Sequence, residues 1–281
     1  MNLKFACADF TFPLLKHDDV IKLISAMGFD GVDIGIFEER SHLQPSNQFN
    51  HIAQNAHILR KKTEERGLAI ADIFLQMALD FKEYALNHPE KLRRDKAREI
   101  FLQCLEYTAE CGCKHMSALP GCVFEDLGNE KSYDLCCEEL AYRVGETKKA
   151  GIVFSVEAHI GSVVSSPESA LRLTNDVSGL SLTLDFTHFM RMGIETSKAL
   201  PLVAKASHFH ARGAANGILQ TNLTENTIDY PSVVKKMKQT GYNGFIGVEY
   251  TYIEWENCNR TDNVSESILM KNYLRNLLLE E

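Results

Sequence analysis

The chain of 281 residues lacks the marks of several protein classes. None of its eight cysteines forms a C-x-x-C pair, so no pairs of this kind frame a zinc site, and reduced thiols are expected. The start, MNLKFACADF, has no basic segment followed by a long apolar stretch, so no secretory signal is expected. No apolar run approaches the roughly 20 residues that span a bilayer. These absences favour a cytoplasmic protein without a membrane partner.

The chain also lacks an excess of basic residues. It holds 30 lysines and arginines against 38 aspartates and glutamates, a formal net charge of −8. Phosphate binding needs a clustered basic surface, so this balance disfavours a nucleic-acid partner. No low-complexity segment or linker divides the chain, and a hydrophobic content of 44% is sufficient for a large core. We therefore expect a single domain over residues 1–281.

Short apolar runs alternate with longer amphipathic stretches, a pattern typical of βα units and a parallel sheet. The length fits one (β/α)8 barrel, which takes roughly 250 residues. An open, doubly wound sheet is the alternative, but no G-x-G-x-x-G motif follows the first run. We predict an α/β fold, a (β/α)8 TIM barrel. The eight predicted strands are residues 3–10, 31–36, 68–75, 114–121, 152–159, 180–186, 206–211 and 245–250.

Four polar residues stand at the carboxyl ends of the last four apolar runs: Glu157, Asp185, His210 and Glu249. The gaps between them are 28, 25 and 39 residues, close to one βα unit each. A single glutamate at a strand end is as consistent with a structural ion pair as with a functional role. Burying three carboxylates near one axis without a cation would cost several kcal/mol per ion, so we predict a metal site. Such ligands suit Mn²⁺, Mg²⁺ or Co²⁺, with Zn²⁺ possible.

Three further residues are candidates for contact with a substrate. His188 follows the strand-six aspartate by three residues and is interpreted as a substrate contact rather than a metal ligand or a turn residue. His159 shares a strand face with Glu157 and either lines the pocket or supports a neighbour. Arg212, just past strand seven, either holds a substrate hydroxyl, carboxylate or phosphate, or pairs with a neighbouring acidic loop.

Three other features have weaker interpretations. Asp33, in the second predicted strand, is interpreted as a structural partner for a nearby loop. The connection over residues 76–88 is long for a barrel, and such a connection is often a lid or a substrate loop. Tyr250, Tyr252 and Trp255 follow the eighth strand and form either an aromatic wall for a sugar or ordinary packing.

Five segments carry a resemblance that covers essentially the whole chain. They are GFDGVDI (28–34), VEAHIGS (156–162), LTLDFTHF (182–189), HFHARG (208–213) and GVEY (247–250). The pattern resembles the xylose isomerase-like barrel superfamily, in its sugar isomerase and epimerase branch. The resemblance implies a small-molecule sugar substrate and a homo-oligomer, either a dimer or a tetramer.

The resemblance to the tagatose/psicose 3-epimerase group also implies roles for single residues. In that group the corresponding strand-end residues bind one divalent ion, usually Mn or Co, which implies that Glu157, Asp185, His210 and Glu249 are ligands. The histidine three residues after the aspartate contacts substrate there and corresponds to His188. An arginine downstream of the strand-seven histidine binds a substrate oxygen. Arg212 is the nearby candidate here, although its spacing is shorter.

The scaffold leaves the reaction open. We expect a divalent-metal-dependent isomerase or epimerase that acts on a keto sugar through an enediolate, with Glu157 and Glu249 as the acid/base pair. The alternative is a lyase, since inosose dehydratases, 3-keto-glycoside-cleaving enzymes and keto sugar acid decarboxylases are similar at the same positions. A noncatalytic sugar-binding module is a third hypothesis. An endonuclease IV-like activity would need a D-x-H element, whereas Asp229 is followed by Tyr230 and Pro231.

Overall fold

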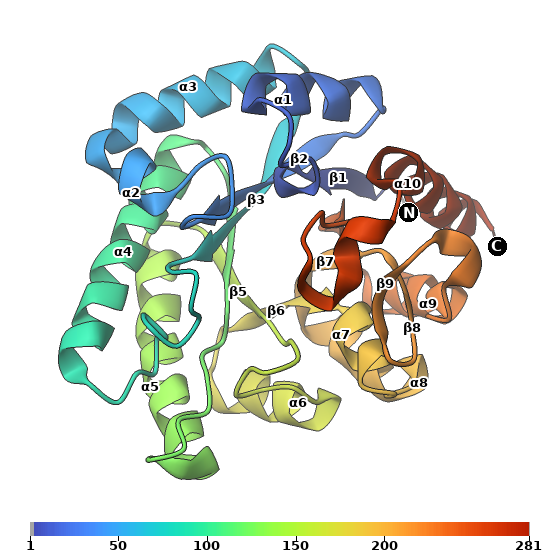
Figure 1. The fold of residues 1–281 in the computed structure, drawn as a ribbon. Coiled ribbons are helices and arrows are strands. Elements are labelled where there is room, and N and C mark those ends of the chain that lie inside the picture. The colour runs from blue at the N-terminus through green and yellow to red at the C-terminus, as the bar shows by residue number, and fades with distance from the viewer. Residues whose placement is uncertain (1–2, 281) are drawn as a thin grey trace.

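The computed structural model describes residues 3–280 and contains a closed barrel of eight parallel strands (Figure 1). The order around the barrel is β1-β10-β7-β6-β5-β4-β3-β2. The barrel strands are β1 (Lys4–Ala8), β2 (Gly31–Phe37), β3 (Ala69–Gln76), β4 (His115–Ala118), β5 (Val153–Glu157), β6 (Ser181–Asp185), β7 (Ala206–Ala211) and β10 (Phe245–Val248). The fold is therefore the predicted single (β/α)8 barrel.

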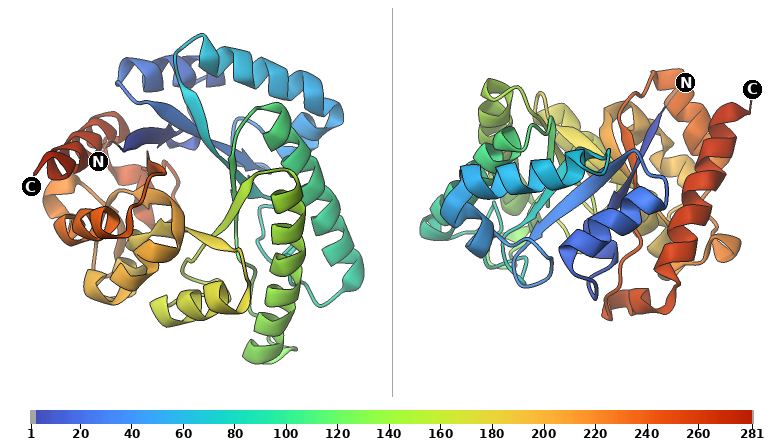
Figure 2. Two further views of the ribbon diagram at one scale, coloured as in Figure 1. Left: turned by 180° about the vertical axis from the view of Figure 1, so that it is seen from behind. Right: turned by 90° about the horizontal axis from the view of Figure 1, so that it is seen from above.

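Helices surround the barrel, as both views in Figure 2 show. The α-helices are α1 (His17–Ala26), α2 (Pro45–Gln48), α3 (Ile52–Glu64), α4 (Lys91–Glu110), α5 (Gly128–Lys149), α6 (Pro167–Asp176), α7 (Phe186–Arg191), α8 (Thr196–Ala199), α9 (Tyr230–Thr240) and α10 (Asn263–Leu279). The 3-10 turns are η1 (Asp9–Thr11), η2 (Phe49–His51), η3 (Leu200–Lys205), η4 (Leu223–Glu225) and η5 (Trp255–Arg260). Lys271 of α10 donates a hydrogen bond to the carbonyl of Gly28 after α1 (3.2 Å). This contact joins the last helix of the chain to the first.

The alternation of side chains along each strand separates an apolar shell from a polar interior. In β3, Ile73 and Leu75 belong to the main hydrophobic core. The alternate residue Asp72 instead contacts His115 of β4, with 2.7 Å between Oδ1 and Nδ1, and accepts a hydrogen bond from Ser117. Polar groups therefore occupy part of the barrel interior, where Val, Ile and Leu dominate in most such barrels.

The eight predicted strands are confirmed, mostly with shorter ends. The first was expected to reach residue 10, but the chain turns at η1, where Asp9 accepts a hydrogen bond from the backbone of Gly35 (2.9 Å). A second sheet was not predicted: β8 (Gly213–Ala215) and β9 (Ile218–Thr221) form an antiparallel hairpin beyond β7. Its first strand, Gly-Ala-Ala, has no apolar-polar alternation from which a strand could be inferred.

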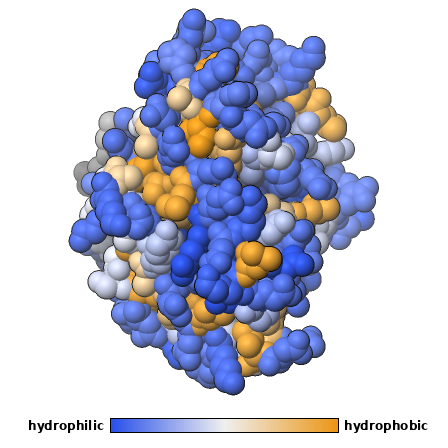
Figure 3. All heavy atoms as spheres, turned by 90° about the vertical axis from the view of Figure 1, so that its left-hand side faces the viewer, coloured by the Kyte–Doolittle hydropathy of each residue, from blue (hydrophilic) through white to orange (hydrophobic). Residues whose placement is uncertain are grey.

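The outer surface is largely polar on the face that Figure 3 shows, where hydrophobic side chains gather only in small separate groups. Within residues 3–280, no helix combines the length and the apolar character needed to cross a membrane. All eight cysteines are free thiols in this part of the chain, and seven of them are buried.

Candidate functional site

Three of the four predicted ligands meet at the carboxyl ends of strands on one side of the barrel. Glu157 ends β5, His210 lies in β7, and Glu249 directly follows β10. The Nδ1 atom of His210 lies 2.7 Å from Oε1 of Glu157 and 3.5 Å from Oε2 of Glu249. All three side chains are buried, and one ligand atom from each lies within 4.8 Å of the others. These residues alone could hold a metal ion.

The fourth predicted ligand, Asp185, belongs to a second group. It ends β6 and caps α7, because Oδ1 accepts a hydrogen bond from the backbone of Thr187 (2.8 Å). This cap places His188 in the first turn of α7, with Nε2 at 3.6 Å from Oδ2 of Asp185 and 3.9 Å from Oε2 of Glu157. The four predicted ligands thus form two overlapping groups that share Glu157.

Arg212 lies between these two groups. Its Nη2 atom is 3.2 Å from Oδ2 of Asp185, and its Nη1 atom is 3.3 Å from Oε2 of Glu249. Nη1 also donates a hydrogen bond to the backbone carbonyl of Glu249 (2.9 Å). The guanidinium therefore pairs with carboxylates of the site itself. An acidic loop was one expected partner, and the structure does not place Arg212 against one.

The two glutamates have pKa values that shift in opposite directions. Burial raises the pKa of Glu249, and the charges of His210 and Arg212 only partly oppose it. Burial would also raise the pKa of Glu157, but the hydrogen bond and charge of His210 outweigh it and hold that pKa below its usual value. Burial alone would lower the pKa of His210, yet the charge of Glu249 and the hydrogen bond to Glu157 raise it to about 10. The imidazole of His210, whose pKa is raised, therefore lies between one glutamate of lowered pKa and one of raised pKa.

The other two histidines of the site have lowered pKa values. Burial lowers the pKa of His188 to about 4, despite the opposing charges of Asp185 and Glu157. Burial also lowers the pKa of His159, whose Nδ1 atom is 2.7 Å from the carbonyl oxygen of Ile160. The two rings lie 5.7 Å apart, with their planes inclined at 60°. Each can therefore present a neutral imidazole to a bound molecule.

A third group includes Asp33, His208 and His210. Oδ2 of Asp33 lies 3.0 Å from Nε2 of His208, and a ligand atom of each of the three residues lies within 4.8 Å of the others. Asp33 thus pairs across the barrel interior, and the prediction that it supports a nearby loop was wrong. The two residues are 175 positions apart in the chain, so local sequence held no sign of their contact.

The residues fit a divalent cation. Oε2 of Glu249 is buried, and among residues 3–280 no group donates a hydrogen bond to it. Nδ1 of His210 faces both buried glutamates, whose charge a cation at this position would compensate. Oxygen ligands with one imidazole suit Mn²⁺, Mg²⁺ or Co²⁺. Glu157, His210 and Glu249 would hold the ion. Asp185 would become a further ligand if it exchanged its contact with Arg212 for one with the ion.

A cleft of about 390 Å³ opens onto these residues, within the size range of small-molecule sites. Its lining includes five predicted site residues: Glu157, His159, His188, Arg212 and Glu249. Trp255 of the expected aromatic wall also lines it, whereas Tyr250 is packed and buried. Gln76, Leu79 and Phe81 of the lining belong to the connection over residues 76–88, which was interpreted as a lid or a substrate loop. Sequence reasoning missed the rest of the wall, namely Phe10, Pro13, Phe37, Arg40, Phe74, Leu119, Leu219, Thr251 and Ile253.

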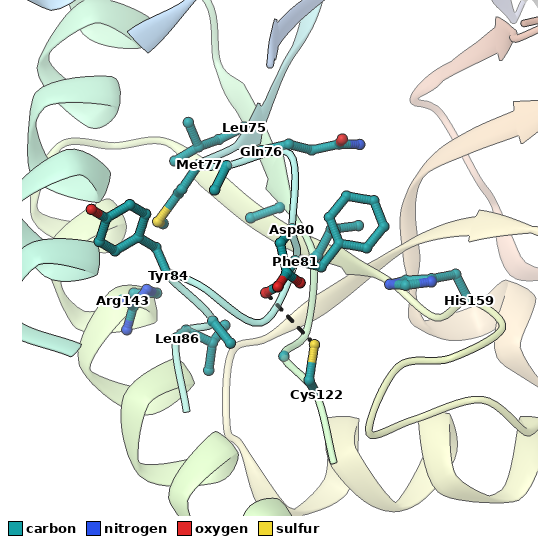
Figure 4. A pocket seen from close by; sticks show the side chains of 15 residues that line it. Leu75, Gln76, Met77, Asp80, Phe81, Tyr84, Leu86, Cys122, Arg143 and His159 are labelled. Carbon is teal, nitrogen blue, oxygen red and sulfur yellow. Dashed lines mark hydrogen bonds between the residues drawn. The ribbon is translucent and has the colours of Figure 1, made fainter. Parts of the chain in front are cut away.

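The long connection after β3 contributes to this wall through Leu79 and Phe81. A smaller cavity of about 40 Å³ lies against the same connection (Figure 4). His159 lies at one side of that cavity, with Tyr84 and Arg143 at the other. A space this small has room for one or two water molecules. The cleft of Glu157 and Glu249 is therefore the candidate substrate site.

Comparisons with known proteins agree with this geometry. The hydroxypyruvate isomerase of Escherichia coli (strain K12) is 23% identical over 236 residues, 79% of this chain and 83% of that protein. The D-psicose 3-epimerase of Clostridium cellulolyticum H10, solved with D-tagatose, superposes with a TM-score of 0.77 at 13% identity over 98% of this chain and 99% of that one. An L-ribulose 3-epimerase superposes with a TM-score of 0.79 at 14% identity over 99% of this chain and 95% of that one.

The match at the level of a family covers residues 21–275, nearly the whole barrel. It agrees with the resemblance carried by the five sequence segments, and the enzyme class expected from them agrees with the names of the relatives. The chain belongs to the xylose isomerase-like TIM barrel family.

Proposed function

We propose that this protein is a divalent-metal-dependent isomerase or epimerase that acts on a keto sugar or a sugar derivative. The observation that carries the proposal is the position of Glu157 and Glu249, which lie on either side of His210, line one cleft, and have pKa values shifted in opposite directions. Paired titratable groups whose pKa values are pushed apart are a usual arrangement for acid and base roles.

The two glutamates would move the proton. One carboxylate accepts a proton from the carbon beside the substrate carbonyl, and the other returns a proton to the neighbouring or the same carbon. A bound divalent cation would polarise the substrate carbonyl and stabilise the negative charge of the enediolate. Return of the proton to the opposite face gives an epimer, and return to the adjacent carbon gives an isomer.

Arg212, His188 and His159 would position the substrate oxygens. The guanidinium of Arg212 is fixed by its hydrogen bond to the backbone of Glu249, so it needs little reorganisation to donate to an oxygen in the cleft. His188, whose pKa is lowered, can donate one N–H to a hydroxyl group. The Nδ1–H of His159 already donates to the carbonyl oxygen of Ile160, so its Nε2 atom can accept a hydrogen bond from a hydroxyl group.

The same histidines bear on the lyase alternative. Elimination of a hydroxyl or glycosyl group needs a general acid beside the leaving oxygen. Burial lowers the pKa of both His188 and His159, so neither carries an extra proton near neutral pH. A histidine is therefore not the expected acid of an elimination, and the exchange experiment below separates the two reactions.

The experiment is exchange of hydrogen in deuterated water. The Mn²⁺-loaded protein is incubated with a panel of keto sugars of three to six carbons. The product is then separated from the paramagnetic protein and examined by NMR. We expect deuterium at the carbon beside the carbonyl and a new isomer or epimer. A dehydrated or split product would select the lyase, and ligand binding without exchange would select a noncatalytic module.

We further propose Mn²⁺ as the physiological ion and a homo-oligomer, a dimer or a tetramer, in the cytoplasm. The oxygen-rich ligand set supports Mn²⁺ over Zn²⁺. Light scattering after size-exclusion chromatography measures the oligomeric state directly. Cleavage of abasic DNA is not expected, since the net charge of −8 disfavours a nucleic-acid partner.

A further inference from the structure

Arg40 is a cation on the wall of the cleft that the mechanism above does not use. It follows β2 by three residues, and its guanidinium carbon lies 5.7 Å from the ring centre of Phe37 and 4.9 Å from that of Phe81. The two rings restrict the guanidinium, since stacking of this kind favours a planar cation. Phe81 comes from the connection after β3, so two segments of the chain fix the position of Arg40.

Two donors of Arg40 have no hydrogen-bond partner among the residues that the structure describes. Its Nε and Nη2 atoms are both buried, and within residues 3–280 nothing accepts a hydrogen bond from either. No ion pair between this side chain and a carboxylate is found in this part of the chain. Burial lowers the pKa of Arg40, but a guanidinium stays charged at neutral pH. A guanidinium that is partly buried without a counter-ion costs free energy, and an anion would recover part of that cost.

The position of Arg40 relative to the catalytic glutamates follows from a series of ring contacts. Phe37 lies 5.1 Å from Phe74, measured between ring centres, and Phe74 lies 5.7 Å from His210. Two aromatic rings therefore separate Arg40 from the candidate metal ligands. All of these rings except His210 line the same cleft as Glu157 and Glu249.

We propose that Arg40 binds an anionic group of the substrate, a carboxylate or a phosphate, at the end remote from the carbon that loses its proton. This inference rests on the proposed function and names the substrate class: an acidic keto sugar. The planar fork of an arginine matches the paired oxygens of either anion, and Nε with Nη2 forms one edge of that fork. A neutral hydroxyl would leave the charge of Arg40 uncompensated.

The experiment compares three ligands that differ only at C6: D-fructose, D-fructuronate and D-fructose 6-phosphate. Trp255 is the one tryptophan of the chain and lines the same cleft, so its fluorescence reports binding. Dissociation constants are measured at constant ionic strength on the Mg²⁺-loaded protein. We expect at least one anionic ligand to bind about tenfold more tightly than D-fructose. The tighter of the two identifies carboxylate or phosphate as the natural group.

Three variants separate the contribution of Arg40 from general charge effects. Arg40→Met should remove the preference for the anion, while Arg40→Lys should retain part of it. Arg172→Met is the matched control, because this substitution removes the same charge away from the cleft. Arg172 pairs with Glu130 on the outer surface (3.0 Å). Metal affinity, measured in parallel, confirms that each variant is folded.

Two results would overturn the proposal. One is binding of all three ligands by the natural protein with dissociation constants that agree within about twofold. The other is an undiminished preference for the anion in Arg40→Met. Failure of the proposed function would look different from failure of this inference. The protein would then still prefer the anion through Arg40, but it would catalyse no exchange of substrate hydrogen with solvent.

Discussion

Arg212 and Asp185 form a buried ion pair, with 3.2 Å between Nη2 and Oδ2. One of the four predicted metal ligands therefore already contacts a cation supplied by the protein. The same guanidinium reaches Glu249, so it stabilises a site that would otherwise hold three buried carboxylates near one protonated histidine. Metal binding and the Arg212 contacts are thus expected to be coupled.

Replacing Arg212 tests this coupling. Arg212→Met should destabilise the metal-free protein by about 3 kcal/mol, because it leaves Asp185 and Glu249 buried without their cation. Saturating Mg²⁺ or Mn²⁺ should restore more stability to this variant than it adds to the natural protein. Thermal unfolding with and without metal measures both effects. Arg212→Lys keeps the charge and serves as the control, and equal metal-induced shifts in all three proteins would contradict the coupling.

Replacing Glu249 tests the acid/base assignment. Glu249→Gln keeps the size of the side chain but removes the group that exchanges a proton, so kcat should fall by about 10²-fold or more. Steady-state kinetics on the keto sugar found in the exchange experiment measure the loss. Glu254→Gln, at an exposed position just outside the cleft, is the matched control. Near-normal turnover by Glu249→Gln would show that another residue carries the proton.

The raised pKa of His210 predicts that metal binding releases protons. The imidazole is protonated below about pH 10 in the metal-free protein, whereas a metal ligand must be neutral. Affinity for the metal should therefore rise with pH across the neutral range. Calorimetry at pH 7.5 in two buffers of different ionisation enthalpy should give at least one proton released per ion, because the raised pKa of Glu249 adds to the release from His210. Identical heats in both buffers would contradict the assignment of His210 as a protonated ligand.

The contact between Asp33 and His208 leaves no room for a side chain at Gly247 of β10. A Cβ atom at this position would lie 1.9 Å from Oδ2 of Asp33 and 3.0 Å from Nε2 of His208. Gly247→Ala should therefore cost about 1–3 kcal/mol of stability in urea unfolding. Gly145→Ala in α5 is the control, since a Cβ there meets nothing within 4 Å and alanine favours a helix. Equal stability of the two variants would mean that the interior rearranges freely.

The barrel and the location of the site were predictable because both depend on regular features of the sequence. Short apolar runs indicate buried strands, and polar residues at their carboxyl ends meet at one mouth. Glu157, His210 and Glu249 meet there as expected. Their roles as ligands and as the acid/base pair stay predictions that the experiments above test.

The details that depend on side-chain reach were not predictable. The cap that Asp185 provides to α7, together with its contact to Arg212, divides the four expected ligands into two groups. Neither contact leaves a periodic pattern in the sequence. Arg40 likewise stands in a loop, and its position depends on Phe81, 41 residues further along the chain. Tertiary contacts of this range are decided by packing rather than by local propensity.

The most direct test of the central claim is a crystal structure of the Mn²⁺-loaded protein with an anomalous difference map at the manganese edge. We predict one peak bound by Glu157, His210 and Glu249, with Asp185 as the fourth ligand after its contact with Arg212 is exchanged. The absence of a peak at these residues, or a peak at Asp33 and His208 instead, would contradict the account.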